Sequence, residues 1–331
     1  MRMLKLCLLA TTALALAATP AFAADFSKDH IDVIVKATTS QYWATVFDGA
    51  NAAAQKLGVS ISTLGAPAET DVGKEVSIME NSIQTKPTAI VIAATNAQAL
   101  AQPIAAATDA GIPVIVIDSN ANTDKYVTFL ATNNVSAGEK AADELARCVK
   151  ARTGKDEGDV AYMTALAGAQ SLNDRDKGFV DGLKKYPNLK IVAHRVGNND
   201  PGRALSDAED ILTSHPKLVG LFADNELEGD GAGRAIQEKS LGSKMCAVAF
   251  DTSDQEIAFV RDGNLDGLIV QNPYMMGYAG IWYALAAANG AVLPHTVDSG
   301  VHVVTKENID SPQMAGLLNP KKYQISHYLG G

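Results

Sequence analysis

The stretch that decides the fold is residues 89–118, AIVIAATNAQALAQPIAAATDAGIPVIVID. It begins with a short apolar, β-branched run at 89–93 and continues through an alanine-rich segment with helical spacing at 97–110. A second apolar run follows at 113–117. Gly111 stands where the helix has to end, because glycine accepts the left-handed backbone of a helix terminus. The pattern predicts one strand–helix–strand unit of a parallel sheet.

The same alternation extends over most of the chain. Further strands are predicted at 31–35, 59–64, 126–130, 159–163, 191–196, 218–222, 247–250 and 268–270. Helices are predicted between them at 43–56, 72–84, 137–151, 171–185, 203–213, 229–239 and 275–289. About ten strands are too many for one small sheet, and about 300 residues usually form more than one core. We therefore expect an α/β fold with two doubly wound parallel sheets, dividing near Thr132.

The first residues have the order of a secretory signal peptide. Arg2 and Lys5 precede an apolar stretch of about 13 residues, and small residues follow through Ala23. We expect residues 1–23 to be removed, since the apolar stretch is shorter than the roughly 20 residues of a spanning helix. The formal charge of −9 then becomes about −11. An acidic chain without basic clusters argues against nucleic acid as a partner.

Two cysteines, Cys148 and Cys246, remain in the predicted mature chain. An even number of thiols in an oxidising compartment permits one disulfide. Two separate buried thiols are the alternative, because the sequence does not give the distance between the two Cα atoms.

Polar and aromatic residues follow nearly every predicted strand. In open α/β sheets ligands bind beyond the carboxyl ends of the strands, so these residues form the expected site. They are Lys36, Ser40, Tyr42, Trp43, Asp118, Asn199, Asn225, Asp251 and Gln271, while Arg175 lies within the predicted helix at 171–185. Carboxylates, amides and a guanidinium bind hydroxyl groups, and aromatic rings cover the apolar face of a sugar.

A catalytic or cofactor site is not evident in the same set. No histidine, cysteine or serine nucleophile follows a strand, and the six histidines have no metal-ligand spacing. The glycine patterns of nucleotide-binding loops are absent. The glycines at 229, 231 and 233 are interpreted as close helix packing. We therefore expect no enzyme activity, no cofactor and no metal, although Asp118 and Asp251 leave a glycosidase-like carboxylate pair as an alternative.

Several of these residues also have a purely structural interpretation. Asp118 and Asp251 are suited to capping the segments that follow them. Tyr42 and Trp43 are suited to core contacts at a helix start, and Arg175 to a solvated helix surface beside acidic neighbours. Their joint occurrence at strand ends favours a site.

At these positions the chain resembles the periplasmic sugar-binding proteins of the ribose-binding type, which deliver ligand to ABC importers. The resemblance covers about residues 31–306. Its ordered blocks are 47–50, 110–115 with Asp118, 133–134 with Gly138, 174–175 with 178–179, 222–225, 250–251 and Gln271. It implies that Tyr42 and Trp43 stack on a sugar, and that Asp118, Arg175, Asn225, Asp251 and Gln271 bind its polar groups. Lys36 and Ser40 fall on cleft-facing positions.

Three departures from the ribose-binding pattern argue against ribose itself. Ser119 stands in place of an arginine, Ala93 in place of an asparagine and Asn199 in place of an aromatic residue. Lys36 adds a cation. A different pentose, a deoxy or branched sugar, a sugar alcohol or a weakly acidic sugar derivative fits the altered set.

The resemblance also implies two lobes of the type I periplasmic binding fold, joined by a three-segment hinge that closes on the ligand. The expected N-terminal lobe is 24–131 with 272–297, and the C-terminal lobe is 132–271 with 298–331, including a C-terminal segment packed on that lobe. We expect a periplasmic monomer that passes its sugar to the membrane permease of an ABC importer. A periplasmic sensor read by a chemoreceptor or a membrane kinase is the alternative.

Overall fold

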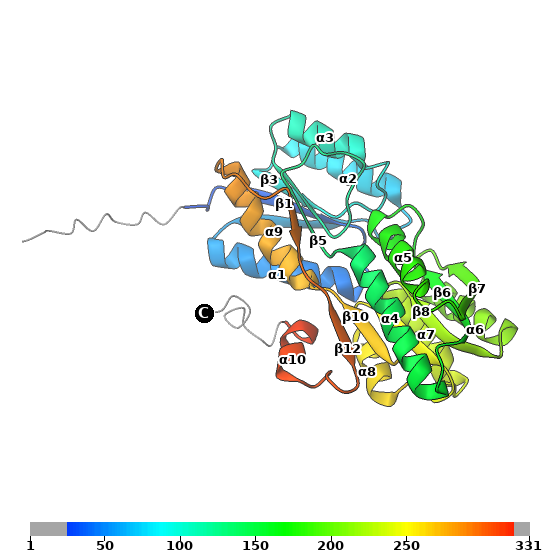
Figure 1. Cartoon of the computed structure of the whole chain (residues 1–331). Coiled ribbons are helices and arrows are strands. Elements are labelled where there is room, and N and C mark those ends of the chain that lie inside the picture. Colours follow the sequence, from blue (N-terminus) through cyan, green and yellow to red (C-terminus); the bar gives the residue numbers. More distant parts are fainter. Residues whose placement is uncertain (1–24, 321–331) are drawn as a thin grey trace, which may run out of the picture.

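The computed structural model describes residues 25–320 as two α/β lobes (Figure 1). The predicted signal peptide, 1–23, lies outside the described residues. The first six-stranded sheet has the spatial order β11 (Thr296–Asp298), β5 (Thr128–Ala131), β4 (Val114–Ile117), β3 (Ala89–Ile92), β1 (His30–Val35) and β2 (Ser60–Gly65). The second has the order β12 (His302–Thr305), β10 (Gly267–Val270), β9 (Cys246–Phe250), β8 (Leu218–Ala223), β6 (Gly158–Thr164) and β7 (Leu189–Val196).

Helices cover both faces of each sheet. The first sheet packs against α1 (Gln41–Leu57) and α9 (Pro273–Ala288) on one face and against α2 (Val72–Thr85) and α3 (Ala101–Asp109) on the other. The second packs against α4 (Asn134–Thr153) and α5 (Gln170–Leu183) on one face. Its other face is covered by α6 (Pro201–Ser214), α7 (Glu226–Glu238), α8 (Asp254–Asp262) and α10 (Pro312–Leu318). This confirms the predicted fold class.

Strand pairing repeats in the two sheets. Among the described strands all pairs are parallel except β10 with β12, which is antiparallel. The strand order reverses at β1 and, in the equivalent place, at β6. Ligands bind outside the carboxyl ends of the strands at such reversals. The topology therefore places one potential binding edge on each lobe.

The chain passes between the two sheets three times, after β5, after β10 and after β11. The proposed lobe boundaries at 131/132 and 271/272 lie in the first two connections. The third, at 297/298, falls one residue inside β11, because Asp298 still pairs with Ala131. Beyond β12, Ile309, Met314 and Leu317 pack into the core of the second lobe, and residues 321–331 lie outside the described part of the chain.

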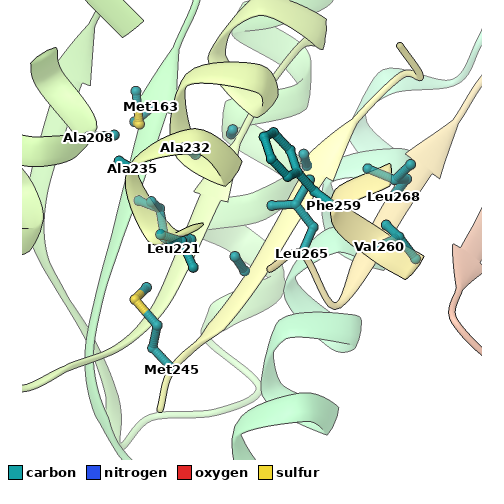
Figure 2. Close-up of a cluster of buried hydrophobic side chains, with 14 of the residues drawn as sticks. Met163, Ala208, Leu221, Ala232, Ala235, Met245, Phe259, Val260, Leu265 and Leu268 are labelled. Atoms are coloured by element: carbon teal, nitrogen blue, oxygen red, sulfur yellow. The ribbon is translucent and has the colours of Figure 1, made fainter. Parts of the chain in front are cut away.

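The core of the second lobe shows why α7 carries Gly231 and Gly233. Figure 2 shows Leu221, Ala232 and Phe259 packed in this core. A Cβ at Gly233 would lie 2.2 Å from the Phe259 ring, and one at Gly231 would lie 2.6 Å from the main chain of Ala204. Any larger residue would push neighbouring helices away from α7. These glycines therefore serve close helix packing.

Two further glycines fix the helix that carries Arg175. A Cβ at Gly138 of α4 would lie 2.0 Å from the carbonyl oxygen of Arg175, and a Cβ at Gly178 of α5 would lie 2.0 Å from that of Val135. The two helices therefore meet with their main chains in contact. This close crossing determines where the Arg175 side chain leaves α5.

A disulfide joins Cys148 of α4 to Cys246 of β9, with Cα atoms 6.0 Å apart. The structure thus decides between the two interpretations that the sequence left open. Asp266 lies close to both sulfurs, and these three residues are the one potential metal-ligating group among residues 25–320. A disulfide sulfur is not the thiolate that binds a metal.

Candidate functional site

The carboxyl ends of the two sheets face each other across a cavity that both lobes line. All ten residues predicted from the sequence line it. Five further lining residues were not predicted: Glu69, Ser171, Leu172, Glu226 and Leu227. A ligand in this cavity would therefore contact both lobes.

The carboxylates of Asp118 and Asp251 occupy equivalent places in the two lobes. Asp118 follows β4 and Asp251 follows β9, and their φ angles are 59° and 76°. Left-handed backbone is uncommon for residues other than glycine, and asparagine and aspartate tolerate it best. The capping interpretation is wrong for Asp251, because Ser253 is the N-cap of α8.

Asp118 is held from two sides. Its Oδ2 lies 2.8 Å from the Lys36 ammonium, and its Oδ1 accepts a hydrogen bond of 2.8 Å from the Tyr42 hydroxyl. All three side chains are buried. The cation that Lys36 adds to the pocket is therefore neutralised by Asp118 and is not left free to attract an anionic ligand.

Trp43 is oriented by a carboxylate that the sequence did not suggest. Its Nε1 donates to Glu69 Oε1 at 2.7 Å, and its ring lies 5.4 Å from the Lys36 ammonium and edge-on to Tyr42. Burial raises the pKa of Glu69, and Lys36 opposes that shift. Glu69 lies four residues beyond β2, outside the positions directly after a strand. Its place in the sequence therefore does not mark it as a site residue.

Arg175 is anchored inside the second lobe. Its Nε and Nη2 donate to Asn134 Oδ1 at 3.2 and 3.0 Å, and its Nη1 donates to the carbonyl oxygen of Asp224. Its guanidinium lies 3.4 Å from the Phe250 ring centre, and Nη1 lies 3.8 Å from Asp251 Oδ2. With 2% of its surface exposed, Arg175 is not a solvated helix charge. These bonds hold the guanidinium in a fixed orientation at the cavity.

Asp251 and Gln271 form a pair beside Arg175. Gln271 Nε2 donates to Asp251 Oδ1 at 2.7 Å. Burial raises the pKa of Asp251 to about 6, and Arg175 acts in the opposite direction. The Oε1 of Gln271 is buried without a hydrogen-bond partner among residues 25–320. A buried acceptor of this kind is normally satisfied, so it suits a ligand hydroxyl.

Asn225 and Asn199 complete the polar wall on the second lobe. Asn225 Nδ2 donates to Asn199 Oδ1 at 2.7 Å. The Oδ1 of Asn225 accepts from the Glu228 main chain and so caps α7. One side of the Asn225 amide is therefore structural, which leaves its second amide hydrogen for a ligand.

The two rims meet beside the cavity, so the structure is a closed form. The main-chain N–H of Ser171 donates to Ser119 Oγ at 3.1 Å. The main-chain N–H of Asn120 donates to Gln170 Oε1, also at 3.1 Å. Ser119, which replaces the arginine of ribose binders, is fully buried and joins the lobes. Its hydroxyl is therefore used for a contact between the lobes.

A family model described as a periplasmic binding protein domain matches residues 31–291. The chain belongs to this family. Among curated relatives, the ribose import binding protein RbsB of Escherichia coli K12 is 30% identical over 85% of this chain and 91% of its own length. The D-apiose import binding protein of Actinobacillus succinogenes is 27% identical over 80% of this chain and 81% of its own length.

Solved structures of periplasmic binding proteins superimpose well on this one. A carbohydrate transporter solute-binding protein from Agrobacterium radiobacter, in complex with D-arabinose, is 44% identical with a TM-score of 0.86, covering 88% of this chain and 99% of that one. An ABC transporter solute-binding protein from Agrobacterium vitis with bound D-fucose is 36% identical, with a TM-score of 0.84 and coverage of 87% and 99%.

Family membership fixes the class of protein. Periplasmic binding proteins of this kind are transport components and not enzymes, and membership implies a periplasmic location. Among residues 25–320 no helix has the length and apolar character needed to cross a membrane.

Proposed function

We propose that this periplasmic binding protein captures an uncharged monosaccharide or sugar alcohol between its lobes and delivers it to the membrane permease of an ABC importer. One observation carries the proposal. Side chains from both lobes line one shared cavity. These side chains include all ten predicted residues, whose carboxylate, amide and guanidinium groups can bind hydroxyls. A ligand that touches both walls favours the closed form, which is the state a permease can distinguish from the open one.

The charges around the cavity favour an uncharged ligand. Two lining cations, Lys36 and Arg175, are outnumbered by four carboxylates: Glu69, Asp118, Glu226 and Asp251. Lys36 is also paired with Asp118 at 2.8 Å. Arg175 lies 3.8 Å from Asp251, so both lining cations already have a carboxylate partner. An anionic sugar would bring another negative charge into this buried site, which is unfavourable. Of the ligands that the sequence allows, the weakly acidic derivative therefore fits least well.

Apolar walls come from both lobes. Tyr42 and Trp43 line the cavity from the first lobe, and Leu172 and Leu227 line it from the second. The pocket has no aromatic residue where ribose binders carry one, at Asn199. The two leucines can cover the second C–H face of a sugar, although without the ring stacking of an aromatic residue.

A thermal-shift screen of refolded, ligand-free protein tests the function. Its panel contains pentoses including D-arabinose and D-ribose, hexoses, D-fucose, sugar alcohols and sugar acids. A true ligand at 100 times its Kd stabilises the fold by about 2.7 kcal/mol. For a chain of this size that raises the Tm by roughly 5 °C. Stabilisation by sugar acids alone, or by none of the panel, would contradict the proposal.

The mature form and its assembly state are tested separately. N-terminal sequencing of the periplasmic protein should begin at Ala24 or Asp25, as the signal peptide predicts. Light scattering should give the mass of a monomer.

A further inference from the structure

The N–H groups at the start of α1 donate hydrogen bonds to side chains of both lobes. Within the first lobe, Ser40 Oγ accepts from the N–H of Trp43 at 3.3 Å and caps the helix. The two N–H groups before it are bound from the second lobe. Glu226 Oε1 accepts from Gln41 at 3.1 Å, and Glu226 Oε2 accepts from Tyr42 at 2.8 Å. One carboxylate of the second lobe thus satisfies two of the N–H groups that a helix start leaves free.

The charge of Glu226 complements a helix that lacks its own acidic residue. The first turn of α1 contains no aspartate or glutamate. A negative charge near a helix N-terminus is favourable, because the unpaired N–H groups there carry partial positive charge. The second lobe supplies this charge only while the lobes are closed.

Glu226 is not needed to cap its own helix. Asn225 caps α7 by accepting from the main chain of Glu228. The side chain of Glu226 is therefore directed to the opposite lobe, where it is buried. Burial raises its pKa to about 7, and the bonds from Tyr42 and Gln41 act in the opposite direction.

A weaker contact accompanies it on the same rim. Gln41 Nε2 approaches Asp254 Oδ1 at 3.5 Å, and the Asp254 N–H donates to Gln41 Oε1 at 3.2 Å. Both side chains are exposed, so water competes for these bonds. The buried carboxylate of Glu226 is therefore the principal contact between α1 and the second lobe.

We propose that Glu226 is a positioning residue that holds the lobes closed around the ligand, with the main chain of Gln41 and Tyr42 as its partner. Both of its oxygens already accept main-chain hydrogen bonds. Tyr42 links this latch to the ligand cavity, because its hydroxyl is bound to Asp118 while its N–H is bound to Glu226. The latch therefore forms in the same closed state that encloses the ligand. The affinity part of this inference rests on the proposed function.

The test compares Glu226→Ala and Glu226→Gln with the wild type. Glu80→Ala serves as a control, since it removes one carboxylate from an exposed position on α2. Affinity and dissociation rate are measured by stopped-flow with the sugar that gives the largest thermal shift. Hydrogen bonds to charged groups contribute about 1.5–3 kcal/mol, which corresponds to about 10- to 150-fold in affinity. We expect a loss in this range for Glu226→Ala and an intermediate loss for Glu226→Gln.

A latch and a ligand contact give different results. A latch acts after the first encounter, so the dissociation rate rises while the association rate stays within about twofold. The order of affinities among sugars is also preserved, because the ligand contacts are unchanged. A reordering of the sugars, or an affinity within twofold of wild type and of Glu80→Ala, would overturn the proposal.

Small-angle scattering without ligand separates this inference from the proposed function. If the wild type binds no sugar, the proposed function fails. The latch then still predicts that unliganded Glu226→Ala has a larger radius of gyration than the wild type and Glu80→Ala. Equal radii for all three proteins would, in that case, overturn the latch as well.

Discussion

Replacing Asp251 by asparagine removes one charge from the ligand site while keeping the shape of the residue. The backbone at position 251 has a φ of 76°, which asparagine tolerates well and alanine does not. Asparagine also retains an oxygen that can accept the hydrogen bond from Gln271. Asp251→Asn therefore reports the loss of charge with little backbone strain, and Asp251→Ala adds that strain.

The expected effect at pH 7.5 follows from the loss of a charge-assisted hydrogen bond. Such a bond contributes about 1.5–3 kcal/mol, so we expect sugar binding to weaken by about 10- to 150-fold. The affinity is measured by isothermal titration calorimetry, using the sugar identified in the thermal-shift screen. Circular dichroism checks the fold, because Arg175 loses the carboxylate 3.8 Å away.

The pKa of Asp251 adds a second, independent expectation. Since that pKa is about 6, the carboxyl group is charged at pH 7.5 and mostly protonated at pH 5. A ligand that prefers the charged form binds the wild type about tenfold more weakly one pH unit below the pKa. Groups that titrate in both proteins cancel in the comparison. The ratio of wild-type to Asp251→Asn affinity should therefore fall by about tenfold between pH 7.5 and pH 5.

Two results would refute this reasoning. Unchanged affinity of Asp251→Asn at pH 7.5 would remove Asp251 from the ligand site. An affinity ratio that is the same at pH 5 and pH 7.5 would show that the charge of the carboxylate does not contribute.

Three further changes have defined outcomes. Trp43→Ala should weaken sugar binding by about 2- to 12-fold because ring contacts are lost, and Trp43→Phe should bind more nearly like the wild type. Calorimetry measures both affinities. An affinity of Trp43→Ala equal to that of the wild type would exclude stacking on Trp43. Replacing both Cys148 and Cys246 by serine removes a disulfide between residues 98 positions apart. The free energy of unfolding, measured by urea titration, should fall by up to about 4.7 kcal/mol. An unchanged value would mean that the two thiols are not bridged in solution. Burial raises the pKa of Glu228 to about 8, so the folded state binds the Glu228 proton more tightly than the unfolded state does. The Glu228 side chain therefore destabilises the fold increasingly as the pH rises from about 4.5 to 8. Glu228→Gln should therefore raise the Tm at pH 8 and have little effect at pH 4.5, and a Tm gain independent of pH would contradict that cause.

Much of the candidate site was accessible from local sequence. Asp118, Asp251 and Gln271 each follow a predicted strand directly, and parallel strands bring their carboxyl ends to one edge of the sheet. Arg175 lies within a helix, and its assignment came from the family resemblance. Its burial and its bonds to Asn134 follow from the close crossing of α4 and α5, which the pattern of single residues does not give.

The sequence by itself determined the alternation of strands and helices and the residues at the strand ends, because both depend on side chains that are near one another along the chain. Tertiary structure alone decided that Lys36 is neutralised by Asp118, that Glu69 orients Trp43 and that the two thiols are bridged. It also decided that Glu226 reaches the start of a helix 184 residues away. The physical reason is that these contacts depend on how the two sheets and their loops are placed in space, and residues distant in sequence meet only after both lobes have packed.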